Sequence, residues 1–164
     1  MRDILILYAD YNVWANKKMT DAILALPAGF SEKEIKSSFS SISKTLYHML
    51  DAESIWWQRM KLSERIIVPS ENKEASLREI INALLQTNIQ WQEWVSNASD
   101  AALDHVFQYQ NSKKEVFKDH IYQMLMHVFN HGTYHRGQLV TMMRELDIEK
   151  IPQTDLIVFC RTKK

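Results

Sequence analysis

Two histidines, His131 and His135, lie four residues apart inside a segment with helical periodicity. Residues four apart share one face of a helix, so the two imidazole rings can reach a common metal ion. Gly132 and Gly137 accompany the pair and are two of the three glycines in the chain. A glycine inside a helix costs about 0.5–1 kcal/mol relative to alanine. We therefore expect crowding against the backbone here, from a partner helix, a metal or a ligand.

Helical phase sorts the histidines of this segment. The expected inward stripe has a 4-3-4-3 spacing and comprises Ile121, Leu125, Val128, Gly132, His135, Leu139, Met142 and Leu146. At about 100° per residue, His131 falls roughly 40° from His135, and His127 roughly 80° from it. The pattern favours His131 and His135 as ligands and leaves His127 a peripheral candidate. Two buried imidazoles without partners are unfavourable, and a shared metal would satisfy both.

The two histidines need at least one further ligand from elsewhere in the chain. Zinc normally takes three protein ligands in a catalytic site and four in a structural one. Cys160 is the only cysteine, so a thiolate cluster is excluded. His48 is the candidate because it is the only histidine on another predicted long helix, although phase alone does not select it. His105 and His120 are expected to face solvent or belong to a hairpin.

Glu53 is an acidic residue near the centre of the apolar arc of the predicted second helix. A buried carboxylate needs a partner. One candidate is Arg136, which would make a structural salt bridge. The alternative is a metal-bound water or a histidine N–H, which would place Glu53, and with it Arg136, in the immediate surroundings of the metal. The sequence leaves both interpretations open, and the catalytic residues stay unknown.

The periodicity of the apolar residues predicts four long amphipathic helices. Their expected spans are Arg2 to Leu26, an N-cap at Ser40 or Ser41 to Lys61, Ala75 to Ser96, and Lys118 to Leu146. Between Leu103 and Phe117 the pattern changes to alternation, which indicates a two-stranded excursion. The predicted fold is all-α: a four-helix bundle with a small hairpin or irregular excursion before the last long helix, and a short helix docked after Pro152. We expect a single domain over residues 1–164.

Charge and hydropathy exclude several classes of partner. Lysine and arginine number 20, as do aspartate and glutamate, and the absence of a basic block argues against nucleic acid. The chain has no run of 18 apolar residues, and its first apolar run is too short for a secretory leader. We expect a cytoplasmic protein with no membrane partner.

The sequence resembles the DinB family over nearly its whole length. The motifs that carry the resemblance are Trp14-Ala-Asn16, Leu46-Tyr-His48-Met-Leu-Asp-Ala-Glu53, the stretch NHGTYHRGQ from Asn130 to Gln138, and Pro152-Gln-Thr-Asp155. The resemblance implies a four-helix bundle, commonly a homodimer, with a divalent metal held by His48, His131 and His135. Zinc and nickel both suit three histidines. His127 belongs to the family's pattern but is not carried over as a ligand.

Three neutral imidazoles leave the charge of a divalent metal uncompensated and at least one coordination position open. Such a metal lowers the pKa of a bound water or thiol and makes it a nucleophile near neutral pH. Several members of the DinB family are thiol S-transferases. The resemblance therefore implies a transferase that uses a low-molecular-weight thiol as co-substrate and acts on a small-molecule substrate.

Two alternatives remain from the sequence. A metal-dependent hydrolase of a small substrate needs a general base, and Gly132 stands where the HExxH motif has its glutamate, so Glu53 or Tyr47 would have to serve. The other alternative is a non-catalytic metal-binding module of a stress response. A set of three histidines argues mildly against that role, because structural sites usually have four protein ligands.

Overall fold

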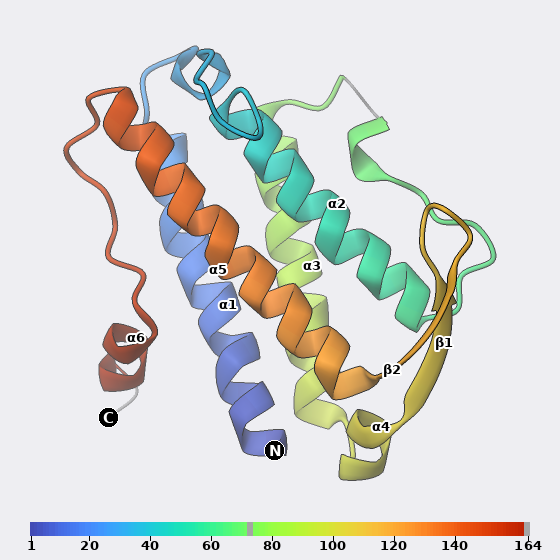
Figure 1. The fold of residues 1–164 in the computed structure, drawn as a ribbon. Coiled ribbons are helices and arrows are strands. Elements are labelled where there is room, and N and C mark those ends of the chain that lie inside the picture. Colours follow the sequence, from blue (N-terminus) through green and yellow to red (C-terminus); the bar gives the residue numbers. More distant parts are fainter. Residues whose placement is uncertain (72–73, 163–164) are drawn as a thin grey trace.

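The structure is a computed structural model that describes residues 1–71 and 74–162. Its long helices are α1 (Arg2–Leu24), α2 (Ile42–Met60), α3 (Leu77–Asn97) and α5 (Ile121–Glu145). They pack in a closed circuit in which α1 contacts α3, α3 contacts α2, α2 contacts α5, and α5 returns to α1 (Figure 1). The predicted all-α four-helix bundle is confirmed.

Short elements lie between the long helices and, in the case of α6, after the last of them. They are the 3₁₀ turns η1 (Phe30–Glu32) and η2 (Pro69–Glu71), the helices α4 (Asp100–Asp104) and α6 (Leu156–Thr162), and the strands β1 (Val106–Gln110) and β2 (Val116–His120). The strands form the expected hairpin. They pair antiparallel, with Val106 opposite His120 and Gln110 opposite Val116 (Figure 1).

One predicted boundary is wrong. The last long helix begins at Ile121 rather than at Lys118, because residues 118–120 pair with β1 and so belong to the hairpin. The chain passes directly from β2 into α5. The hairpin thereby sets where the histidine-bearing helix begins. The short helix α4 gave no recognisable periodicity in the sequence.

Serine caps fix the start of two of the long helices. Ser41 precedes α2, and its Oγ accepts a hydrogen bond from the backbone N–H of Lys44 at 3.2 Å. Ser76 precedes α3 and forms a reciprocal capping box with Glu79. Such caps satisfy N–H groups that have no partner inside the helix. The helix that carries His48 therefore begins at Ile42.

Most of the buried apolar residues form two large clusters with a polar layer between them, and a third, smaller cluster joins Tyr11 and Ala15 of α1 to Phe159 of α6. One large cluster contains Leu46, Leu84 and Leu139 near one end of the bundle, and the other contains Trp91 and Leu125 near the opposite end. Each long helix contributes at least one buried polar side chain to the layer between the two clusters. The polar set is Asn12 and Asn16 on α1, Glu53 on α2, Asn88 on α3 and Arg136 on α5.

Across the described ranges 1–71 and 74–162, none of the helices combines the length and the apolar character that crossing a bilayer requires.

Candidate metal centre

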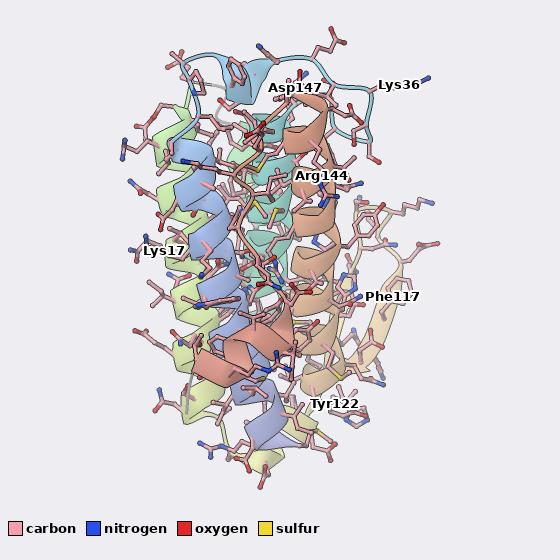
Figure 2. The ribbon with its side chains drawn as sticks, turned by 90° about the vertical axis from the view of Figure 1, so that its left-hand side faces the viewer. Lys17, Lys36, Phe117, Tyr122, Arg144 and Asp147 are labelled. Carbon is pink, nitrogen blue, oxygen red and sulfur yellow. The ribbon has the colours of Figure 1, made fainter. Side chains whose placement is uncertain are left out.

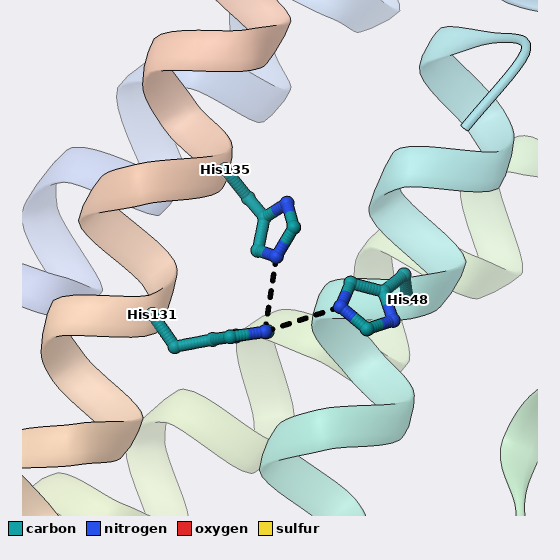
Figure 3. Close-up of side chains that lie close together, drawn as sticks. All are labelled: His48, His131 and His135. Carbon is teal, nitrogen blue, oxygen red and sulfur yellow. Dashed lines mark hydrogen bonds between the residues drawn. The ribbon is translucent and has the colours of Figure 1, made fainter. Parts of the chain in front are cut away.

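Three histidine rings converge between α2 and α5 (Figure 3). The Nε2 atom of His131 lies 3.1 Å from Nε2 of His48 and 2.9 Å from Nε2 of His135. Zinc binds imidazole nitrogen at about 2.0–2.1 Å, so the nitrogens of a tetrahedral site lie roughly 3.4 Å apart. The three nitrogens are therefore spaced closely enough to share one ion.

The order of burial along α5 agrees with the helical phase. His135 is buried, with 4% of its surface exposed, whereas His131 is half-buried and His127 is exposed. The ring of His127 lies 5.9 Å from that of His131, centroid to centroid, and stays outside the convergent group. The structure thus brings His131 and His135 together and leaves His127 outside, and their role as metal ligands stays a prediction. The packing of α2 on α5 supplies His48, which phase alone could not select.

A glutamine one turn further along α5 fixes the tautomer of His135. Nδ1 of His135 lies 2.7 Å from Oε1 of Gln138. An amide oxygen only accepts hydrogen bonds, so Nδ1 must carry the proton and Nε2 keeps its lone pair toward the other two rings. This role of Gln138 was not predicted from the sequence. Its i, i+3 spacing from His135 was the signal that could have revealed it.

Burial keeps the three rings neutral. It lowers the pKa of His131 to about 4, helped by repulsion from His135, His48 and His127. Burial is also the main cause that lowers the pKa of His48 and of His135. At pH 7 the three imidazoles are therefore unprotonated. Neutral imidazole is the form that binds a metal, and one ion would satisfy three facing lone pairs that cannot all bond to one another.

Aromatic side chains hold the rings in place. Phe39, just before α2, stacks on His48 with centroids 4.3 Å apart, and meets the edge of His135 at 5.8 Å. Tyr134 packs edge-on against His135 at 5.0 Å. Gln138 also donates to Ser38 at 3.4 Å, which ties the segment before α2 to α5. These contacts restrain the rings of His48 and His135.

The polar layer beside this group is a closed ring of hydrogen bonds that involves all four long helices. Arg136 donates through Nη1 to Oδ1 of Asn12 at 2.9 Å and to Oδ1 of Asn16 at 2.8 Å. Asn12 donates to Glu53 at 3.2 Å, and Asn88 donates to the other carboxylate oxygen at 2.5 Å. Asn16 donates to Asn88 at 2.8 Å and completes the ring. All five side chains are at most 2% exposed.

This ring corrects the partners proposed for Glu53. Glu53 and Arg136 do lie in one network, but the described side chains form no direct salt bridge, because asparagines stand between them. The asparagines were missed by the sequence analysis, although Asn88 falls within the apolar stripe of its helix. Burial raises the pKa of Glu53 to about 7, while the two asparagine donors and Arg136 act to lower it. The carboxyl group therefore titrates near neutral pH.

The two glycines have different explanations. A Cβ atom at Gly132 would lie 2.9 Å from Oδ1 of Asn12 and 3.2 Å from Nη1 of Arg136, so these two side chains leave no room for it. The expected crowding is confirmed there. At Gly137 it is wrong, because nothing lies within 4 Å of the position that a Cβ would occupy.

Fold and site together define a four-helix bundle whose second and last long helices bring three histidines to one point. The sequence model of the DinB family matches residues 1–160, and the chain belongs to that family. It is 29% identical over 161 residues to Protein DinB of Bacillus subtilis (strain 168), in an alignment that covers 93% of this chain and 91% of that protein. The resemblance inferred from the motifs is confirmed.

Proposed function

We propose that the chain binds one divalent metal, zinc or nickel, through Nε2 of His48, His131 and His135. The observation that carries this proposal is the convergence of three neutral imidazoles with their ligand atoms within 4.8 Å of one another. Their nitrogen donors suit both metals. Gln138 orients His135, and Phe39 restrains His48. Both contacts belong to the kind that tunes metal affinity in other proteins.

We further propose that the protein is a thiol S-transferase that uses a low-molecular-weight thiol. When bound, the metal would lower the pKa of a thiol or water at its open position. The three histidines add no negative charge and so leave the full charge of the ion to act on that group. Cys160 lies on α6 and is not part of the histidine group, so the thiol comes from outside the chain. Family membership supports this reading.

The hydrolase alternative finds less support in the surroundings of the histidines. Both oxygens of Glu53 accept hydrogen bonds from asparagines. Tyr47 lines a cavity with Glu79 and Ile80 of α3, on the flank of α2 away from α5, and burial raises its pKa. The two bases that a hydrolase would have to recruit are therefore engaged elsewhere. A non-catalytic metal-binding module remains as an outcome of the test.

The experiment is a metal analysis of untagged protein followed by a screen of biothiols. The screen measures consumption of monochlorobimane with each thiol, with and without metal. We expect about one metal ion per chain and a metal-dependent rate with at least one thiol. Metal without any thiol-dependent rate would reject the transferase and favour the non-catalytic module. Metal-dependent hydrolysis of a small ester in the absence of thiol would favour the hydrolase.

We also propose, from family membership, that residues 1–164 form one domain and that the chain is a homodimer. A single chain has a mass of 19.3 kDa. Light scattering on the purified protein should therefore give about twice this mass, and a monomer mass would reject the dimer.

A further inference from the structure

A second cavity lies on the opposite flank of α5 from the histidines. Its volume is about 650 Å³, and its walls are α1, α5 and the segment Ile151–Leu156 that leads into α6. Figure 2 faces this segment, which runs over the seam between α1 and α5 before the chain enters α6. Tyr11 holds it in place by donating from its hydroxyl to the carbonyl oxygen of Thr154 at 2.8 Å. None of the three convergent histidines lines this cavity.

Arg136 lines this cavity and carries one N–H group, at Nε, that has no hydrogen-bond partner among the described residues. Its Nη1 bonds to the asparagines of α1, and its Nη2 donates to Oγ1 of Thr133, which also lines the cavity. The Nε atom is buried. Nε and Nη2 form one edge of the guanidinium, the edge that binds a carboxylate through two parallel hydrogen bonds. A buried N–H without a partner is unfavourable, and an anion would satisfy it.

The other lining residues add a second cation and an apolar wall. Arg144 lies two turns further along α5 and also lines the cavity, and Asp155 is the acidic residue among the lining side chains. The Arg136 and Arg144 backbones are separated by about 12 Å along the helix. Val140 and Ile151 also line the cavity and give it apolar surface. An inorganic ion would leave that surface unused.

We propose that this cavity is a binding site for a small organic anion. A carboxylate pairs with the Nε–Nη2 edge of Arg136, its carbon chain lies against Val140 and Ile151, and a second anionic group reaches Arg144. The closest chemical class is a short dicarboxylate. The site is independent of the metal. None of the three histidines lines the cavity, and arginine rather than histidine would recognise its ligand.

The test is an NMR titration of full-length protein, as purified, with glutarate, butyrate and inorganic phosphate at constant ionic strength. We expect saturable shifts with glutarate at Thr133, Thr154 and their neighbours, and weaker binding of butyrate. Arg144→Gln should weaken glutarate about fivefold and leave butyrate unchanged. The matched control is Arg78→Gln on α3, an exposed arginine outside the cavity, which should change neither.

Three results would overturn the proposal: no saturable shift with glutarate, shifts confined to the surroundings of His48 and His131, or phosphate binding as tightly as glutarate. Arg136→Lys tests the central contact, because an ammonium group cannot reproduce the paired donors. It should abolish binding of both carboxylates. Where this variant fails to fold, Arg144→Gln decides, since Arg144 is exposed and stands outside the buried ring.

Discussion

Gln138 accepts a hydrogen bond from Nδ1 of His135 at 2.7 Å and thereby turns the Nε2 lone pair of that histidine toward His131 and His48. The bond links two residues one turn apart on α5, so the same helix supplies both a candidate ligand and the group that orients it. Gln138 in turn donates to Ser38 and to Tyr134. The side-chain amide of Gln138 is thus fixed by hydrogen bonds to three residues, His135, Ser38 and Tyr134.

Removing this orienting contact should weaken metal binding without removing a ligand. Gln138→Leu leaves His135 free to change tautomer and ring orientation. Loss of such a contact lowers metal affinity by about 10–100-fold in other proteins, and we expect a loss of that order in a competition titration with a chromophoric chelator. Gln90→Leu, an exposed glutamine on α3, is the control and should keep wild-type affinity. Equal affinities for both variants would show that Gln138 does not orient the ligand.

The two glycines of α5 should respond to alanine with opposite signs. Gly132→Ala forces a Cβ against Asn12 and Arg136 and should destabilise the protein by about 1–3 kcal/mol. Gly137→Ala places its Cβ in open space and should stabilise the helix by about 0.5–1 kcal/mol. Urea denaturation of the two variants beside wild type measures both. Destabilisation by Gly137→Ala would contradict the description of that position.

The buried carboxyl of Glu53 should make stability depend on pH. Its pKa rises from 4.5 to about 7 on folding, so the folded state binds the proton more tightly. The resulting stabilisation is fully present below pH 4.5 and is lost as pH rises through 7, with an amplitude of roughly 3 kcal/mol.

The histidines act in the opposite direction, because the pKa of His131 falls to about 4 on folding. The quantity to measure is therefore the difference in unfolding free energy between wild type and Glu53→Gln, in metal-free protein from pH 5 to pH 8. The advantage of wild type should shrink as pH rises, since glutamine does not titrate. A difference that stays constant over this range would mean that Glu53 is ionised throughout.

Much of this arrangement was accessible from the sequence, because it depends on periodicity. The stripe from Ile121 to Leu146 gave the phase of α5, and the exposure of His127 relative to His135 follows from that phase. Capping serines and the alternating residues before α5 likewise located α2 and the hairpin. These are local signals, which can be recognised in one segment of the sequence without knowing which other segments pack against it.

What the sequence did not reveal depends on contacts between helices. The hydrogen-bonded ring of three asparagines, Glu53 and Arg136 is one example. Predicting it requires knowing how far each of the four helices is shifted along its axis relative to the others, which helical phase does not determine. Gly132 and Gly137 look alike in the sequence and differ because the side chains of Asn12 and Arg136 crowd only Gly132. The cavity beside Arg136 forms because the segment Ile151–Leu156 packs near α1 and α5. No periodic pattern in the sequence predicts that placement.

The most direct test of the metal centre is the metal content of four purified variants measured beside wild type. His48→Ala, His131→Ala and His135→Ala should each lose the metal, whereas His127→Ala, the neighbouring histidine outside the group, should retain about one ion per chain. Circular dichroism should confirm that every variant remains helical. Retention of metal by His131→Ala together with its loss from His127→Ala would contradict the proposed ligand set.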